Sequence, residues 1–335
     1  MTAPDITPPA AAPRWREINW AGLAESYALV AALVVLFCIF AMLLPTTFFT
    51  WANVSTMLGS QAVLVFLTLA LIIPLTTGDF DLSVAAILTI SAMTIAVLNA
   101  RMGVALPVAI LAALCVGAIA GAANAFFILY FRIPSLIVTL GMGTFINGLT
   151  LWMSNSATIG GIDFALVMAV VGTRFLGIPL AFYYAILMAA AIWYVFGFTA
   201  MGRRLLFVGR GREVARLSGI QVDRVRFASL MASAMIAALA GVLYAGTIGA
   251  ADPNSGNTFL LPAFAAAFLG ATAITPGRFN PVGSVVAVYF IVIGITGLTM
   301  LGIQSFVQNL FYGGALVSAV ALSQLVRKRE EQQVG

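Results

Sequence analysis

The chain has 335 residues, of which 62% are apolar and only 8% are charged, with a formal net charge of +5 and a mean hydropathy of +1.08. Soluble domains have about 45–50% apolar and about 25% charged residues, so these figures exclude a soluble globule, a disordered chain and a nucleic-acid-binding module. A helix needs about 20 apolar residues to cross a bilayer, and the apolar total suffices for about ten such helices. We therefore expect an all-α, polytopic integral membrane protein.

The residues that the chain lacks exclude several kinds of chemistry. It has no histidine, which excludes Ser-His-Asp hydrolysis, histidine-ligated zinc and imidazole proton relays. Its single lysine, Lys328, precedes Arg329, so there is no Walker A loop, and any ATP must be bound by another chain. Cys38 and Cys115 each lie in an apolar run and are interpreted as packing residues rather than a disulfide or metal pair. The sequence thus predicts no catalytic residue, no metal site and no cofactor.

The chain divides into a central apolar domain and two polar ends. Residues 1–24 are rich in proline and polar side chains and lack the pattern of a cleaved signal, so they are predicted to be a flexible cytoplasmic tail. Residues 25–326 are predicted to form the transmembrane domain, and residues 327–335 a cytoplasmic C-terminal tail. Ten apolar runs are the predicted spans: Tyr27–Leu44, Gln61–Thr76, Leu82–Asn99, Val104–Tyr130, Leu136–Met153, Pro179–Phe198, Phe227–Ala250, Phe259–Ile274, Val282–Leu301 and Phe306–Leu325.

The distribution of basic residues predicts the orientation. If both termini are cytoplasmic, 14 of the 16 basic residues lie on the cytoplasmic side, and only Arg101 and Arg174 lie outside. This asymmetry fits the positive-inside rule, so the net positive charge is better explained by topology than by an anionic partner.

Two segments of the chain show a faint internal repeat. Gln61–Val84 and Leu260–Gly283 each consist of an apolar run, a Gly-x-Phe-Asx turn and a second apolar run. Duplicated segments with a Gly or Pro interruption often build the site of a transporter. A chance similarity between two apolar stretches is the alternative.

The longest internal polar stretch is the predicted cytoplasmic loop at residues 199–226. Residues 213–218 of this loop can form a short helix, and Gly219 is suited to end it because glycine readily adopts the left-handed conformation. Val214 and Leu217 would make a small apolar face surrounded by arginines, which suits a groove on a partner protein. The alternative is a basic loop held inside by charge bias alone.

This loop resembles the coupling segment of the ribose-type permeases of ABC importers. The resemblance rests on ten matching residues: Gly202, Arg203, Gly209, Glu213, Ala215, Arg216, Leu217, Ser218, Gly219 and Ile220. The chain departs from the family pattern at Arg210, Gly211 and Val214. Three further segments resemble family motifs, and the likeness covers most of residues 50–325: Gly78–Val84, Pro134–Gly141, and Ala265–Gly270 with Gly277, where Ala271 breaks a glycine pair.

The resemblance implies a permease subunit in the bacterial cytoplasmic (inner) membrane. The implied partners are a cytoplasmic ABC ATPase, a second permease chain as a homodimer or related permease, an extracytoplasmic sugar-binding protein and membrane lipid, with no nucleic acid. The implied substrate is a sugar or polyol, moved by alternating access that the ATPase drives. The residues assigned to ATPase coupling are Gly202, Arg203, Gly209, Glu213, Val214, Ala215, Leu217, Ser218 and Gly219.

Five polar residues are candidates for the substrate path. Asp79 and Asp81 interrupt the apolar sequence between the second and third spans, where ionisable groups are often functional, although Asp81 can instead cap the next helix. Asn124 shares a helix face with Gly117 and Gly121, which favours helix packing over a place in the path. Thr144 and Asn147 share a face of the fifth span, with the same two alternatives.

Two other classes of function compete with an ABC permease. An ion-coupled secondary transporter needs buried charged groups for its ion, and only the segment with Asp79 and Asp81 offers them. An intramembrane aspartyl protease needs two aspartates that face each other from different helices, whereas these two are two positions apart on one segment. A plain channel is also disfavoured, because it would give the coupling-like loop no role. We therefore expect a transporter subunit that is not itself an enzyme.

Overall fold

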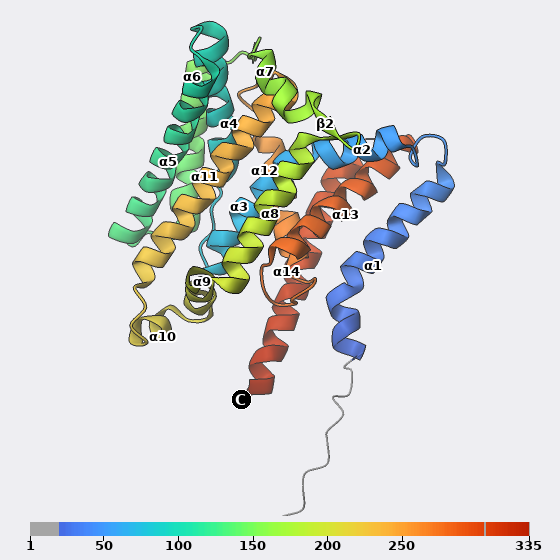
Figure 1. Cartoon of the computed structure of the whole chain (residues 1–335). Coiled ribbons are helices and arrows are strands. Elements are labelled where there is room, and N and C mark those ends of the chain that lie inside the picture. Colours follow the sequence, from blue (N-terminus) through green and yellow to red (C-terminus); the bar gives the residue numbers. More distant parts are fainter. Residues whose placement is uncertain (1–19, 305, 335) are drawn as a thin grey trace, which may run out of the picture.

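The computed structural model of the protein describes residues 20–304 and 306–334, and it is a bundle of long helices that run side by side (Figure 1). Four two-residue strands and two short π-helices, η1 and η2, interrupt the helices. The elements in chain order are α1 (Trp20–Leu43), α2 (Trp51–Ser60), α3 (Ala62–Thr76), α4 (Val84–Ile95), η1 (Ala96–Arg101), α5 (Leu106–Tyr130), α6 (Ser135–Ser154), β1 (Ile159–Gly160), α7 (Phe164–Val167), η2 (Met168–Gly172), β2 (Arg174–Phe175), β3 (Ile178–Pro179), α8 (Leu180–Phe198), α9 (Ala200–Arg210), α10 (Arg212–Leu217), α11 (Val222–Ile248), β4 (Ala250–Ala251), α12 (Asn257–Gly270), α13 (Pro281–Met300) and α14 (Phe306–Val334).

The predicted all-α membrane architecture is confirmed. Within the described residues, eight helical segments are long and apolar enough to cross a bilayer. They are Ser26–Leu43, Trp51–Thr76, Val84–Arg101, Leu106–Tyr130, Ser135–Ser154, Leu180–Phe198, Val222–Ile248 and Pro281–Met300. The apolar helix α12 is shorter, at 14 residues. The total of ten spans remains a prediction.

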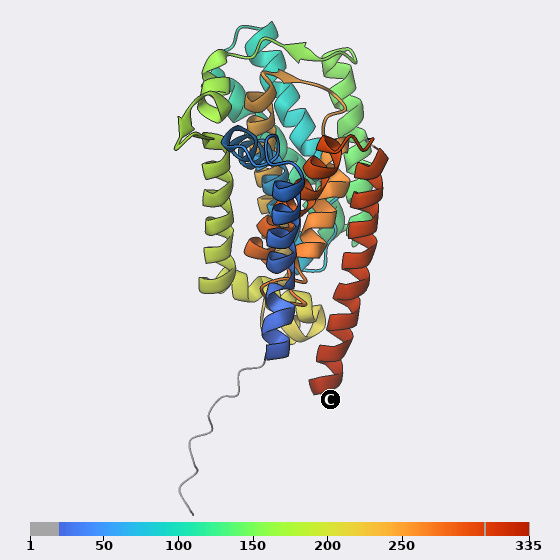
Figure 2. The ribbon, with the colours of Figure 1, turned by 90° about the vertical axis from the view of Figure 1, so that its right-hand side faces the viewer.

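The core of the bundle lies around α3, α4 and α11. Every residue of α3 and α4 is buried, and α11 packs against α3, α4 and α5. A helix that is apolar on all sides can face either lipid or other helices in a membrane protein, so the composition of α3 allows this central place without requiring it. By contrast, α1 lies on the outside of the bundle (Figure 2), and most of its described side chains are partly or fully exposed. Cys38 and Cys115 are not paired in a disulfide, and both are exposed on the bundle rather than packed inside it as expected.

The two ends of the bundle differ. Two small antiparallel sheets lie at one end: β1 pairs with β4 (Ile159 opposite Ala251), and β2 pairs with β3 (Arg174 opposite Pro179). The helices α9 and α10 lie at the other end, where α1 begins and α14 finishes (Figure 1). The start of α1 and the end of α14 thus lie at the same end of the bundle as α9 and α10 (Figure 1), and the cytoplasmic placement of the two termini remains a prediction.

The predicted tails only partly coincide with the described residues. Residues 1–19 of the predicted N-terminal tail lie outside the described part of the chain, and α1 already begins at Trp20. The helix α14 continues through the predicted C-terminal tail to Val334.

Candidate functional site

The short helix predicted in the 199–226 loop is present as α10, Arg212–Leu217. Gly219 follows it in the left-handed conformation, with φ of 80°, and the Ile220 N–H donates to the Ala215 carbonyl at 3.0 Å. This bond satisfies a carbonyl in the last turn of the helix, as is usual where a left-handed glycine ends a helix. The exposed Glu213 accepts a hydrogen bond from Arg216 at 3.3 Å on the same helix.

The surface of α10 carries exposed apolar side chains. Val214 is 59% exposed and Leu217 is 88% exposed, whereas Ala215 is fully buried against the rest of the protein. The predicted apolar face of Val214 and Leu217 therefore points away from this chain. Its role in coupling remains a prediction.

Two glycines hold α9 against the neighbouring helices. A Cβ atom at Gly202 would overlap the backbone of Val195 and Phe196 at the end of α8. A Cβ atom at Gly209 would overlap the Thr76 carbonyl at the end of α3. Thr199 begins α9 as its N-cap, with Oγ1 accepting from the Gly202 N–H at 3.2 Å. The absence of side chains at Gly202 and Gly209 thus allows α9 to pack backbone to backbone, while Arg203 is exposed.

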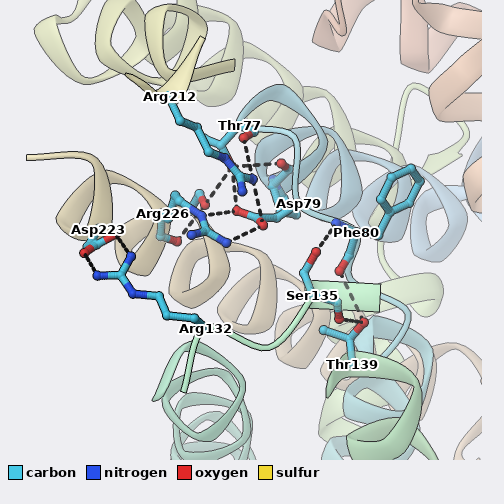
Figure 3. Close-up of polar contacts among 11 residues, drawn as sticks. Thr77, Asp79, Phe80, Arg132, Ser135, Thr139, Arg212, Asp223 and Arg226 are labelled. Carbon is cyan, nitrogen blue, oxygen red and sulfur yellow. Dashed lines mark hydrogen bonds and ion pairs between the residues drawn. The ribbon is translucent and has the colours of Figure 1, made fainter. Parts of the chain in front are cut away.

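A charge cluster joins the α3–α4 break, by which we mean residues 77–83, to α10 and α11 (Figure 3). The buried Asp79 accepts two hydrogen bonds of 2.7 Å from the Nε and Nη2 atoms of Arg226, on α11. Arg212, the first residue of α10, donates to Asp79 Oδ1 at 3.0 Å and to the Thr77 carbonyl at 3.1 Å. Two-point guanidinium–carboxylate pairs of this kind are the strong ones, because charge and geometry are both matched.

Sequence reasoning missed the two arginines that bind Asp79. They lie 133 and 147 residues after it, among seven arginines in one loop. The available signal was a buried aspartate in a chain with a surplus of arginines, because a buried carboxylate needs a partner. That signal does not show which of the arginines bind Asp79.

The backbone of the α3–α4 break is satisfied by α6. Ser135 Oγ accepts from the Phe80 N–H at 3.0 Å (Figure 3), and Thr139 Oγ1 accepts from the Leu82 N–H at 3.1 Å. The single hydroxyl hydrogen of Thr139 is directed to the Ser135 carbonyl of its own helix at 2.8 Å and to the Phe80 carbonyl at 3.2 Å. Irregular backbone within a membrane protein is tolerated only where such partners or a water-filled cavity replace the helical bonds. Ser135 and Thr139 belong to the motif at Pro134–Gly141.

Asp81 acts at the start of α4. Its Oδ1 accepts from the Ser83 N–H at 3.1 Å and from Ser83 Oγ at 2.6 Å, while Oδ2 accepts from Ser233 on α11 at 3.0 Å. Asp81 thus binds the backbone just before α4, although the N-cap of this helix is Ser83 and no side chain caps it. Asn124 on α5 joins the same group by donating to Ser83 Oγ at 2.7 Å, and its Oδ1 has no partner in the described structure.

The face of α5 that bears Gly117 and Gly121 is a tight helix contact. A Cβ atom at Gly117 would lie 2.5 Å from Ala238 Cβ, and one at Gly121 would lie 2.5 Å from Ala234 Cβ. The close approach of α5 and α11 that the glycine spacing predicts is confirmed, and the fully buried Asn124 lies on this packed face.

Thr144 and Asn147 lie apart from the other candidates. Thr144 is exposed and donates to the Leu140 carbonyl of its own helix at 3.0 Å, and Asn147 is half-buried. Of the five candidates for the substrate path, the structure thus brings Asp81 and Asn124 together, places Asp79 in the charge cluster and leaves Thr144 and Asn147 on the surface of α6.

The two turns of the predicted repeat share their geometry. Gly78 and Gly277 are both left-handed, with φ of 79° and 82°. Asn280 Oδ1 caps α13 by accepting from the Gly283 N–H at 2.6 Å, and Asp81 Oδ1 accepts from the Ser83 N–H just before α4 begins. Both glycines border one cavity of about 140 Å³, whose lining includes Gly209 of α9. These shared features support the repeat and place both turns beside the same short helix.

Within the described residues, no group of three or more acidic, cysteine or histidine side chains is placed to hold a metal ion. The polar groups of this region instead bind one another.

Comparison with known proteins identifies the family to which the chain belongs. Residues 53–320 match the family described as "Branched-chain amino acid transport system / permease component". The chain is 30% identical over 310 residues to the ribose import permease protein RbsC of Escherichia coli K12, covering 91% of this chain and 95% of the relative. No solved structure matches the chain.

Two further relatives from the same strain of Escherichia coli agree. The D-allose transport system permease protein AlsC is 28% identical over 313 residues, which cover 93% of this chain and 96% of that protein. The xylose transport system permease protein XylH is 24% identical over 365 residues, which cover 91% of this chain and 93% of that protein. The resemblance carried by the sequence motifs is confirmed, and the chain belongs to the permease components of bacterial sugar ABC transporters, multi-pass proteins of the inner membrane that are not themselves enzymes.

Proposed function

We propose that the chain forms the translocation path of an ABC importer for a sugar or sugar-like polyol, and that a separate cytoplasmic ATPase drives it through α10. The observation that carries this proposal is the geometry of α10. Val214 and Leu217 point away from the chain, while Gly209, Arg212 and the buried Ala215 fix the helix to the bundle. A rigidly held helix with an outward apolar face can receive a push from a partner and pass it on.

The proposed assembly contains two permease chains, two ATPase subunits and an extracytoplasmic sugar-binding protein. ATP binding would close the ATPase pair and move α10, and the path would then open to the other side of the membrane by a shift between two conformations. In such a dimer, the exposed face of α6 with Thr144 and the half-buried Asn147 is available to a shared path or to the second chain.

The substrate class follows from the chemistry of the interior and from the relatives. The buried carboxylates are engaged by the arginines around Asp79 and by the serines around Asp81, so neither is free to bind a charged solute. The remaining polar groups, including Asn124, are hydroxyls and amides, which suit a neutral, hydroxyl-rich molecule. The relatives named above are permeases for ribose, allose and xylose.

The ion-coupled secondary transporter is the alternative that an experiment must separate. The chain should be reconstituted in vesicles with its ATPase and sugar-binding protein, and uptake of labelled ribose, allose and xylose should be measured. We expect accumulation against a gradient only when ATP and all components are present. Accumulation by the chain alone, driven by a proton or sodium gradient, would show that it is a secondary transporter.

A further inference from the structure

The helix α10 and the end of α9 contact the α3–α4 break, although more than 120 residues separate the two segments in the sequence. Gly209 lies against the Thr76 carbonyl, and Arg212 donates to both the Thr77 carbonyl and Asp79. A Cβ atom at Gly78 would lie 3.5 Å from Arg212 Nη2, so the left-handed glycine also leaves room for the guanidinium. The end of α9 and the start of α10 thus contact the last residue of α3 and the three residues that follow it, residues 76–79.

The two arginines hold Asp79 in different ways. The Arg226 side chain is 9% exposed and binds both carboxylate oxygens, so it neutralises the buried charge by itself. The Arg212 side chain is 39% exposed and reaches only Oδ1, through one nitrogen that also serves the Thr77 carbonyl. Arg212 can therefore leave Asp79 without stranding a buried charge, which is the costly event in a low-dielectric interior.

The structure has space beside Arg212 in which its side chain and α10 can move. Asp79, Arg212 and Arg226 border a cavity of about 520 Å³ between α10, α11 and the start of α6. This space allows α10 and Arg212 to shift together with Asp79, while Arg226 keeps the charge of the carboxylate balanced.

The α3–α4 break passes movement onward. Beyond Asp79, the backbone at Phe80 and Leu82 is bound to Ser135 and Thr139 of α6, and Asp81 is bound to Ser83 at the start of α4. A displacement of Asp79 therefore reaches α4 and α6 through hydrogen bonds. The corresponding turn before α13 has Arg278 in place of Asp79, and the ion pairs of the described structure do not include it.

We propose that Asp79 is a positioning residue for coupling: Arg226 anchors it in the bundle, and Arg212 fastens α10 to it, so that movement of α10 is transmitted to the α3–α4 break. This inference rests on the proposed function, because it assumes that an ATPase moves α10. It adds which residues carry that movement into the membrane domain.

The test is the substitution Arg212→Gln in the complete complex of permease, ATPase and sugar-binding protein. Three quantities are needed: ATPase subunit bound to the permease, the rate of ATP hydrolysis, and sugar taken up per ATP hydrolysed. We expect normal ATPase binding and continued hydrolysis, with the uptake-to-hydrolysis ratio reduced roughly fivefold or more. Arg212→Lys, which keeps the charge, should recover part of the ratio.

The matched control is Arg132→Gln. Arg132 forms a two-point pair with Asp223 at 3.3 and 3.2 Å beside the same cavity, but this pair is exposed, and among the described residues no hydrogen bond or ion pair joins it to α10 (Figure 3). The Arg132→Gln variant should have the same uptake-to-hydrolysis ratio as the wild type. An Asp79→Asn/Arg226→Gln double variant removes the buried pair together, avoids a lone buried arginine, and should show the same loss of coupling as Arg212→Gln.

Three results would overturn the inference. They are an unchanged ratio in Arg212→Gln with normal uptake, an unchanged ratio because hydrolysis and uptake fall equally, and loss of ATPase binding, since the last would assign Arg212 to docking. Failure of the proposed function would look different, because the wild-type complex would then show no ATP-dependent uptake.

Discussion

Gly209 lies directly against the backbone carbonyl of Thr76, so closely that a Cβ atom at position 209 would overlap that oxygen. The contact joins α9 to the end of α3 without any side chain between them. Backbone atoms cannot rotate away as a flexible side chain can, so even a methyl group at this position must displace one of the two helices.

Replacing Gly209 by alanine should therefore destabilise the protein. Overpacking of this kind costs about 1–3 kcal/mol, which outweighs the helix propensity gained by alanine. The measurement is thermal unfolding of the purified protein in detergent, together with sugar uptake. Gly197→Ala in α8 is the matched control, because a Cβ atom there meets nothing within 4 Å. Equal stability and uptake in the two variants would contradict the observed contact.

The exposed apolar face of α10 gives a prediction about the ATPase. Val214→Asp or Leu217→Asp should abolish binding of the ATPase subunit and substrate-stimulated hydrolysis, because a charge would have to be buried in the partner's apolar groove. Membrane insertion should be unchanged, since both side chains already face away from the bundle. Binding can be measured by co-purification with the tagged ATPase.

Leu176→Asp provides the control for this pair of variants. Leu176 is 74% exposed, in the turn between β2 and β3 at the opposite end of the bundle. The substitution adds the same charge in a comparable setting and should retain the ATPase. Normal hydrolysis in Val214→Asp and Leu217→Asp would show that α10 is not the docking helix.

Thr139 offers a test of how the α3–α4 break is held. Thr139→Val keeps the shape of the side chain but leaves the Leu82 N–H without its acceptor. An orphaned backbone donor of this kind costs about 1–3 kcal/mol, so the midpoint of thermal unfolding should fall. Thr150→Val is the matched control, because the buried Thr150 donates only to the Ile146 carbonyl of its own helix. A similar midpoint for both variants would argue against the role of Thr139.

The α5–α11 contact can be tested by exchanging a methyl group across it. Gly121→Ala should destabilise the protein, because its Cβ would lie 2.5 Å from Ala234 Cβ. The double variant Gly121→Ala/Ala234→Gly restores the summed volume and should recover most of the lost stability. Thermal unfolding of the single and double variants measures this coupling. Additive losses would mean that the two positions do not touch.

Much of the architecture could be predicted from the sequence because a membrane helix is recognisable from its own apolar residues. About 20 apolar residues are enough to define a span, and glycine at 219 is enough to end a short helix. The motifs also identified the family and the position of α10. The spacing of Gly117 and Gly121 predicted a close helix contact, because it depends only on the period of one helix.

The relationships between distant segments could not be predicted in this way. The choice of Arg212 and Arg226 as partners of Asp79, the support of the α3–α4 break by Ser135 and Thr139, and the contact of Gly209 with Thr76 all join residues far apart in the chain. In this chain local composition determined which segments are helical, because helix formation and membrane insertion depend on neighbouring residues. Only the tertiary structure decided which polar groups meet, because that depends on how the helices pack and on which partners are then within hydrogen-bonding distance.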